Sequence, residues 1–136
     1  MHEIDLILKE RRNRESRATW PWETFYQKTE RADKLLEEIE KKIKSRNSIQ
    51  EARKQFVTSY ITSFEVYFKD TLLTLLKMVG NDKFIEEVKR KFDMIDLERI
   101  IKEKLSINEL IVSCFNFQDL DQVNKAFSII LSVSFF

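Results

Sequence analysis

The chain has 136 residues and a mass of 16.4 kDa, which fits one domain with a core of its own. It holds one Gly and one Pro, too few for the turns of an all-β fold or for a glycine-rich phosphate loop. Its single Cys excludes an internal disulfide and a multi-cysteine zinc site. The 24 basic and 23 acidic side chains give a formal net charge of +1, so net charge does not indicate nucleic-acid binding. The composition predicts an α-helical domain and leaves its activity open.

The N-terminal part of the sequence predicts a helical turn and then a long helix. The apolar residues of segment 4–8 indicate the turn, and a polar, mainly basic stretch follows over residues 9–17. Pro21 suits the first position of a helix, and Thr19 is the expected cap of that helix. From residue 23 to about residue 44, apolar positions recur at helical spacing.

The segment from Ile49 to Val79 is the longest predicted helix. We expect Asn47 or Ser48 to cap it and Gly80 to end it in a left-handed conformation. On a helical wheel its apolar side chains fall within about 160° of arc, and they are Phe56, Val57, Tyr60, Ile61, Phe64, Tyr67, Phe68, Leu72, Leu75 and Val79. Because this stripe is wider than the ~100° of an ordinary surface helix, more than one neighbour must cover it. The segment is therefore predicted to be the central helix of a bundle.

Four shorter helices are predicted after Gly80. Their expected N-terminal caps are Asn81 or Asp82, Asp96, Ser106, and Asp119 or Asp121. Ser106 and Glu109 stand in the S-x-x-E pattern of a capping box. The predicted fold is an all-α bundle of about six helices with one long central helix, and residues 1–136 are predicted to form a single domain.

Side chains suited to catalysis or metal binding are scarce. The single histidine, His2, lies near the terminus, away from any nucleophile. Cys114 shares an apolar face with Leu110 and Ile111, which favours a buried, inert thiol. The acidic residues form no Glu-x-x-His pattern of a carboxylate metal site. We therefore predict no metal and no cofactor.

Two carboxylates of the long helix are candidate polar residues of a cleft. Glu65 lies at the border of the apolar stripe, where it either pairs with Lys69 one turn later or points into a cleft between helices. Asp70 lies about 140° away around the helix, and we expect it to meet solvent or a basic neighbour.

The basic stretch before Trp20 is a candidate RNA-binding segment. Its side chains would contact phosphates while Trp20 or Trp22 offers a stacking surface, and the predicted contact residues are Arg11, Arg12, Arg14 and Arg17. Glu10 and Glu15 interrupt the stretch, so a solvated segment without a nucleic-acid partner is the alternative.

The last residues form the most hydrophobic stretch of the sequence, IILSVSFF over residues 129–136. Because chain ends are usually solvated, we expect either a partner or further chain to cover this one, and docking into the chain's own core is the alternative. The predicted interface residues are Phe127, Ile130, Phe135 and Phe136.

Two segments resemble a known family. Residues 56–71, FVTSYITSFEVYFKDT, resemble the SxFExYxxD helix of HEPN-superfamily proteins, in particular the RiboL-PSP-HEPN group of bacterial defence-associated proteins. Residues 117–127, FQDLDQVNKAF, are similar to the FQNxDxINKxF segment of that group, which a short stretch ending in an apolar pair follows, as Phe135-Phe136 does here. The order and spacing of the two segments agree with the group.

The resemblance implies an α-helical bundle that often dimerises, with members acting as metal-independent endoribonucleases in toxin–antitoxin or antiviral systems. Glu65 and Asp70 match polar positions of the family but do not suffice for RNA cleavage. The catalytic motif of the family is Arg-x4–6-His on a helix near the C-terminus, and no His follows any Arg in this sequence. We therefore expect a HEPN-like domain that lacks its C-terminal catalytic helix in the residues given.

Two functions are predicted from these observations. The first is a HEPN-like domain of a bacterial defence or toxin-type system, with RNA as a candidate partner. The alternative is a non-catalytic interaction module that forms a homodimer or binds another protein through its apolar C-terminal segment. Since the sequence has no secretory signal and no run of roughly 18–20 apolar residues, we predict a cytoplasmic protein that does not associate with membranes.

Overall fold

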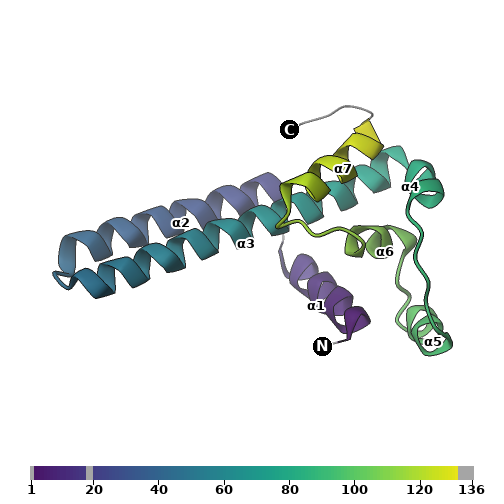
Figure 1. The fold of residues 1–136 in the computed structure, drawn as a ribbon, viewed down its shortest axis with the longest axis horizontal. Coiled ribbons are helices and arrows are strands. Elements are labelled where there is room, and N and C mark those ends of the chain that lie inside the picture. The colour runs from purple at the N-terminus through teal and green to yellow at the C-terminus, as the bar shows by residue number, and fades with distance from the viewer. Residues whose placement is uncertain (1, 18–19, 132–136) are drawn as a thin grey trace. The chain divides into compact units, whose positions relative to one another are not determined.

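The computed structural model describes residues 2–17 and 20–131. Over these ranges the chain is all-α, with seven helices and no strand (Figure 1). The helices are α1 (Glu3–Ser16), α2 (Pro21–Lys42), α3 (Arg46–Val79), α4 (Asp82–Glu87), α5 (Met94–Lys102), α6 (Ile107–Ser113) and α7 (Leu120–Leu131). The predicted all-α bundle with one long helix is confirmed. The additional helix is α1, which runs for 14 residues where the sequence indicated one turn.

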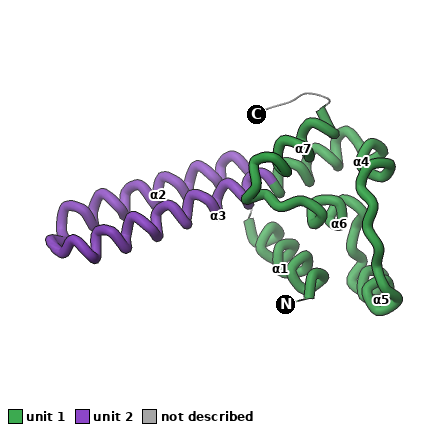
Figure 2. The backbone as a smooth tube through the Cα atoms, in the orientation of Figure 1, with its two compact units in different colours: residues 1–18, 69–136 green, residues 19–68 purple. Residues whose placement is uncertain are grey.

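The chain divides into two compact units (Figure 2). Residues 19–68 form unit 2, and residues 1–18 together with 69–136 form unit 1. Helix α3 supplies residues 46–68 to unit 2 and residues 69–79 to unit 1.

Unit 2 is a hairpin of α2 and the first part of α3, which run in opposite directions (Figure 1). Pro21 is the first residue of α2, where its fixed φ suits a helix and its missing N–H costs nothing. Trp20 occupies the N-cap and makes no hydrogen bond with its side chain, while the predicted cap Thr19 lies outside the described residues. At the start of α3 the Ser48 N–H donates to Ser45 Oγ at 3.5 Å, so Ser45 takes the capping place predicted for Asn47 or Ser48.

Aromatic rings fill the contact between the two helices of unit 2. The Phe25 ring lies 4.8 Å from the Phe64 ring and 5.4 Å from the Tyr67 ring, centroid to centroid. Trp22 meets the edge of Tyr67 at 6.3 Å. Such pairs contribute roughly 0.5–1.5 kcal/mol each beyond the area that they bury, so they fix the register of the hairpin.

Unit 1 holds the larger apolar core. One part is the cluster of Ile4 and Ile7 of α1 with Leu105, against which three half-buried side chains pack. Residues 69–79 of α3 pack against α6 and α7, and α7 also contacts α4. The other buried apolar residues of unit 1 are Leu72, Leu73, Leu76, Phe84, Ile111, Val112, Phe117, Val123, Ala126, Phe127 and Ile130.

Three predicted helix boundaries of unit 1 are confirmed. Gly80 ends α3 with a φ of 99°. Residues that carry a Cβ atom rarely adopt this left-handed conformation. Ser106 and Glu109 form the complete capping box of α6. Asp119 Oδ1 accepts from the Asp121 N–H at 2.9 Å, which satisfies one of the unpaired N–H groups at the start of α7.

Two predicted caps differ from the structure. Asp93, and not Asp96, caps α5: its carboxylate accepts from the Asp96 N–H at 2.8 Å. Asn81 occupies the N-cap of α4 without a capping hydrogen bond from its side chain. Its Nδ2 donates to Asn108 Oδ1 at 2.9 Å. Helix α5 is thus capped three residues earlier than predicted, and α4 begins without a side-chain cap.

Candidate interaction surfaces

The apolar stripe of α3 is only partly covered in unit 2. Val57, Ile61 and Phe64 are 54%, 47% and 43% exposed, and we call these three residues the α3 stripe. They stand four and three residues apart, so they lie on one face of the helix. As predicted, α3 as a whole packs against more than one neighbour, namely α2, α6 and α7. Within unit 2, α2 is the one helix beside α3, and the three stripe residues keep about half of their surface exposed.

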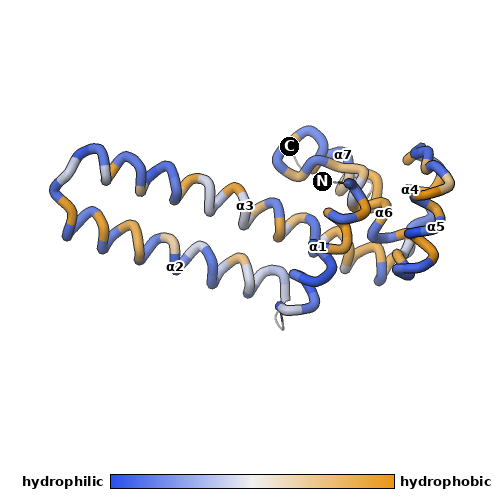
Figure 3. The backbone as a smooth tube through the Cα atoms, turned by 90° about the horizontal axis from the view of Figure 1, so that it is seen from below, coloured by the Kyte–Doolittle hydropathy of each residue, from blue (hydrophilic) through white to orange (hydrophobic). Residues whose placement is uncertain are grey.

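One residue of the α3 stripe, Phe64, contacts α2 through the Phe25 ring, and polar contacts with α2 lie beside the stripe. Tyr60 OH donates to Asp33 Oδ1 of α2 at 3.1 Å, and Arg53 Nε donates to Glu40 Oε1 at 3.0 Å. Since successive residues of a helix are rotated by about 100°, the stripe residue Ile61 points about a quarter turn away from Tyr60 and from α2. Figure 3 shows apolar residues recurring along both helices of the hairpin.

The other side of the hairpin carries a shallow groove of about 420 Å³. Thr62 of α3 lines it and stands about 100° around the helix from Ile61, so the groove and the α3 stripe lie on different faces. The remaining lining residues are Lys28, Arg31, Ala32 and Leu35 of α2 and Thr58, Ser59 and Ser63 of α3. The α3 wall of this groove is therefore made of hydroxyl side chains, whereas the stripe is wholly apolar.

Arg11 of α1, a predicted RNA contact, is engaged within unit 1. Its Nε and Nη2 donate to the two carboxylate oxygens of Glu109, each at 2.7 Å. Its Nη1 and Nη2 also donate to the carbonyl oxygens of Glu103 and Lys104, at 2.8 and 2.9 Å. Lys104 has a φ of 52°, which marks a sharp turn of the chain between α5 and α6. The Arg11 guanidinium thus pairs with carbonyl oxygens that the end of α5 leaves without a helical partner.

The carboxylate of Glu109 accepts hydrogen bonds from several donors. It accepts from Arg11 and also from the N–H and the hydroxyl of Ser106. Burial raises the pKa of this carboxyl, but the hydrogen bonds from Arg11 and Ser106 outweigh burial and hold the pKa below its usual value. The sequence assigned Glu109 to the capping box, and no local pattern indicated its pairing with α1.

The other predicted arginines fall into two groups. Arg14 Nη2 lies 3.4 Å from Glu109 Oε2, and Arg17 Nη2 donates to Asp70 Oδ2 at 2.5 Å. Arg12 is exposed. Three of the four guanidinium groups thus face carboxylates of unit 1, which competes with the phosphate contacts predicted for them.

The two candidate cleft carboxylates belong to different units. Asp70 is 8% exposed and pairs with Arg17, which confirms a basic neighbour for this residue. Glu65 is half-buried on the part of α3 that belongs to unit 2. The described contacts do not bring the two carboxylates together in one site.

The predicted C-terminal interface is partly buried. Phe127 is 7% exposed and Ile130 is 4% exposed, because α7 packs against α4 and residues 69–79 of α3. These two residues therefore belong to the core of unit 1, and their role in an interface with a partner stays a prediction. Phe135 and Phe136 lie outside the described residues.

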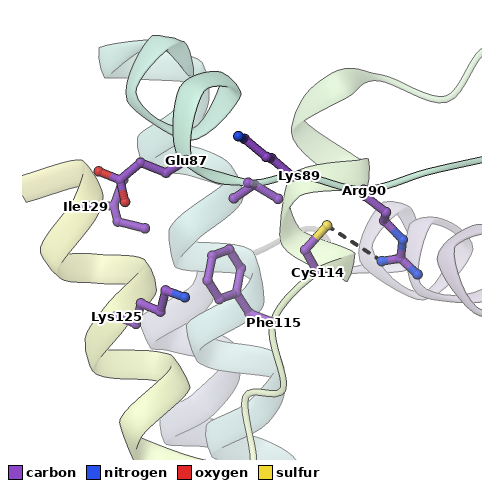
Figure 4. Close-up of a pocket in the computed structure, with 8 residues that line it drawn as sticks. Glu87, Lys89, Arg90, Cys114, Phe115, Lys125 and Ile129 are labelled. Carbon is purple, nitrogen blue, oxygen red and sulfur yellow. Dashed lines mark hydrogen bonds between the residues drawn. The ribbon is translucent and has the colours of Figure 1, made fainter.

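A cavity of about 460 Å³ lies in unit 1 beside Cys114 (Figure 4). Its walls come from residues 87–90 at and after the end of α4, from Cys114 and Phe115 after α6, and from Lys125 and Ile129 of α7. Arg90 Nη1 donates to Cys114 Sγ at 3.6 Å, and this thiol in turn donates to the Leu110 carbonyl. Cys114 is half-buried and lines this cavity, so its thiol is less buried than predicted, and its inertness stays a prediction.

Comparison of the chain with protein-family models, curated proteins and solved structures finds no match. The resemblance to HEPN proteins stays a prediction from the two sequence segments. Among the described residues, no three His, Cys, Asp or Glu side chains gather as a metal site would require. Nor does any helix over those ranges have the length and hydrophobicity needed to cross a membrane.

Proposed function

We propose that this chain is a helical interaction module that pairs with a second copy of itself through the α3 stripe. The observation that carries this proposal is the exposure of Val57, Ile61 and Phe64 on one face of a two-helix unit. An isolated pair of helices buries little apolar surface, and monomeric proteins rarely leave a contiguous apolar face in water. Covering three half-exposed side chains of this size contributes roughly 1 kcal/mol each.

The spacing of the stripe supports pairing with another helix. Intervals of four and then three residues are those of the a and d positions of a heptad, which pack against a neighbouring helix. Two helical hairpins that join along such stripes make a four-helix bundle, a stable arrangement built from two copies of one unit. Pairing with a second copy accounts for the exposed stripe without any other protein.

The proposed surface differs from the one predicted at the C-terminus. Phe127 and Ile130 are already buried in unit 1, so they have little surface left to offer a partner. The stripe residues of unit 2 keep about half of theirs. The alternative function predicted from the sequence, an interaction module, is therefore kept, and its surface moves from the end of the chain to α3.

Analytical ultracentrifugation of matched charge variants tests the proposal. Ile61→Glu places a carboxylate in the stripe, while Thr62→Glu adds the same charge one residue later on the groove side of α3. We expect Ile61→Glu to raise the dimer dissociation constant at least about tenfold, equivalent to about 1.4 kcal/mol, and Thr62→Glu to leave it unchanged. A wild-type chain that stays monomeric, or equal effects of both variants, would overturn the proposal.

The HEPN-like role remains a second proposal, which rests on residues 56–71 and 117–127. It is supported by the all-α fold and by the position of the first segment on the longest helix. Its test is an RNA-cleavage assay with this chain.

A further inference from the structure

The cavity beside Cys114 has the size of a small-molecule site. Its volume of about 460 Å³ falls within the roughly 300–1,000 Å³ of typical ligand pockets. It lies wholly in unit 1 and is independent of the α3 stripe. Its lining is mixed: Val88, Phe115 and Ile129 are apolar, and four charged side chains lie around them.

The ring of Phe115 is held in place from two sides. Phe84 meets it at 5.9 Å with an interplanar angle of 83°, and Phe117 meets it at 6.4 Å and 66°. Phe84 and Phe117 are 0% and 3% exposed, so both supports are anchored in the core. In Figure 4 the Phe115 ring lies in the middle of the lining residues, between Lys125 and Cys114. It offers a fixed apolar surface on which a flat ligand would stack.

Cationic side chains outnumber the acidic one around this ring. Lys89, Arg90 and Lys125 line the cavity together with Glu87. Arg90 is oriented by its ion pair with Glu3 and by its hydrogen bond to Cys114. Lys89 and Lys125 come from different segments, the stretch after α4 and helix α7, and both are exposed. Each ammonium group can therefore turn towards an anion over the Phe115 ring at low cost in desolvation.

We infer that this cavity binds a small aromatic anion, with its ring on Phe115 and its carboxylate or phosphate between Lys89 and Lys125. The Phe115 ring favours an aromatic ligand, and the two ammonium groups select for the negative charge. A neutral aromatic molecule of the same size would lose the charged contacts and bind more weakly.

Cys114 provides a direct readout, because it is the only cysteine of the chain and lines the cavity. The rate at which its thiol reacts with the neutral reagent dithiodipyridine is measured with increasing naphthoate. We expect naphthoate to slow the reaction in a saturable way, and naphthalenemethanol, its neutral analogue, to require at least about tenfold higher concentration. Added salt should weaken the protection by naphthoate, since the lysines are exposed to solvent.

Charge variants separate a specific site from general shielding. Lys125→Glu should weaken protection by naphthoate about tenfold or more, Lys125→Arg should keep it, and Lys102→Glu, at the end of α5 and outside the cavity lining, should also keep it. Circular dichroism of each variant establishes that the helices are intact. Absence of protection in the wild-type chain, equal protection by the neutral analogue, or equal loss in Lys125→Glu and Lys102→Glu would overturn the inference.

Discussion

Arg11 and Glu109, 98 residues apart in the sequence, form a two-pronged ion pair with both N–O distances at 2.7 Å. The pair joins α1 to the first turn of α6. Because Arg11 also binds two carbonyls at the end of α5, one guanidinium ties three helices of unit 1 together.

Loss of this guanidinium should destabilise unit 1. We expect Arg11→Ala to lower the free energy of unfolding by about 2 kcal/mol, because Glu109 and two carbonyls lose a charged donor in a partly buried place. Chemical unfolding followed by circular dichroism measures the change. The matched control Arg12→Ala, at an exposed position of the same helix, should stay within about 0.5 kcal/mol of the wild type. Equal stabilities for both variants would show that the ion pair contributes nothing.

The pKa of Glu109 predicts how stability depends on pH. The carboxyl has a pKa below its usual value in the folded chain, so the folded state favours its ionised form. Its contribution is therefore fully present above the unfolded pKa of about 4.3 and is lost as the pH falls through the lower folded pKa. Glu109→Gln should unfold more easily than the wild type at neutral pH, and the difference should shrink in acid. A difference that grows as the pH falls would contradict the assignment.

Because Phe127 is buried, its substitution tests whether it belongs to the core of unit 1 or to an interface with a partner. Phe127→Ala should lower the free energy of unfolding by about 3–5 kcal/mol, as truncation of a buried Phe usually does. For a core residue, the milder Phe127→Leu should cost less stability and leave the association state unchanged. Sedimentation at several concentrations, in parallel with unfolding curves, measures both. Association weakened by Phe127→Leu without a loss of stability would return this residue to an interface.

RNA cleavage tests the HEPN-like prediction. The family motif is Arg-x4–6-His, and no His follows an Arg in the 136 residues, so we expect no cleavage of labelled RNA by this chain with or without a chelator. A general base is needed to activate the attacking 2′-hydroxyl, and the Asp70 carboxylate is already paired with Arg17. Cleavage that persists after repeated purification and is lost in Asp70→Asn would show that this carboxylate takes part in catalysis.

Binding of RNA is a separate question from cleavage. If the α1 arginines contacted phosphates, affinity would fall steeply with salt. Because Arg11, Arg14 and Arg17 face carboxylates, we expect weak binding that Arg12→Ala, at the exposed position, reduces by no more than about threefold. Filter binding at several salt concentrations measures it. Tight binding abolished by Arg12→Ala would establish this segment as an RNA site.

Local patterns in the sequence predicted helix lengths, helix ends and caps that depend on residues close together in the chain. The extent of α3 follows from its apolar periodicity, and its end follows from Gly80. The capping box of Ser106 and Glu109 involves residues three positions apart, so the sequence shows it directly. The choice between Asp93 and Asp96 as the cap of α5 could not be predicted, because both are suitable acceptors and backbone geometry decides between them.

Features that depend on distant residues were not predictable in the same way. Helix α1 buries only Ile4 and Ile7, so it lacks the apolar periodicity that identifies a surface helix. Ion pairs also hold α1 against α5 and α6, including those of Arg11 with Glu109 and of Asp5 with Arg99. The exposure of the α3 stripe could not be predicted either, because the width of an apolar face does not show how much of it the rest of the chain covers.

In the proposed dimer, the α3 stripe of one copy lies against that of another. A Cys114→Ser chain carrying Ile61→Cys would be treated with a short bis-maleimide cross-linker, in parallel with one carrying Thr62→Cys on the groove side of α3. We expect cysteine at position 61 to give covalent dimers at low protein concentration and cysteine at position 62 to give few. Equal yields at the two positions, or none at either, would contradict it.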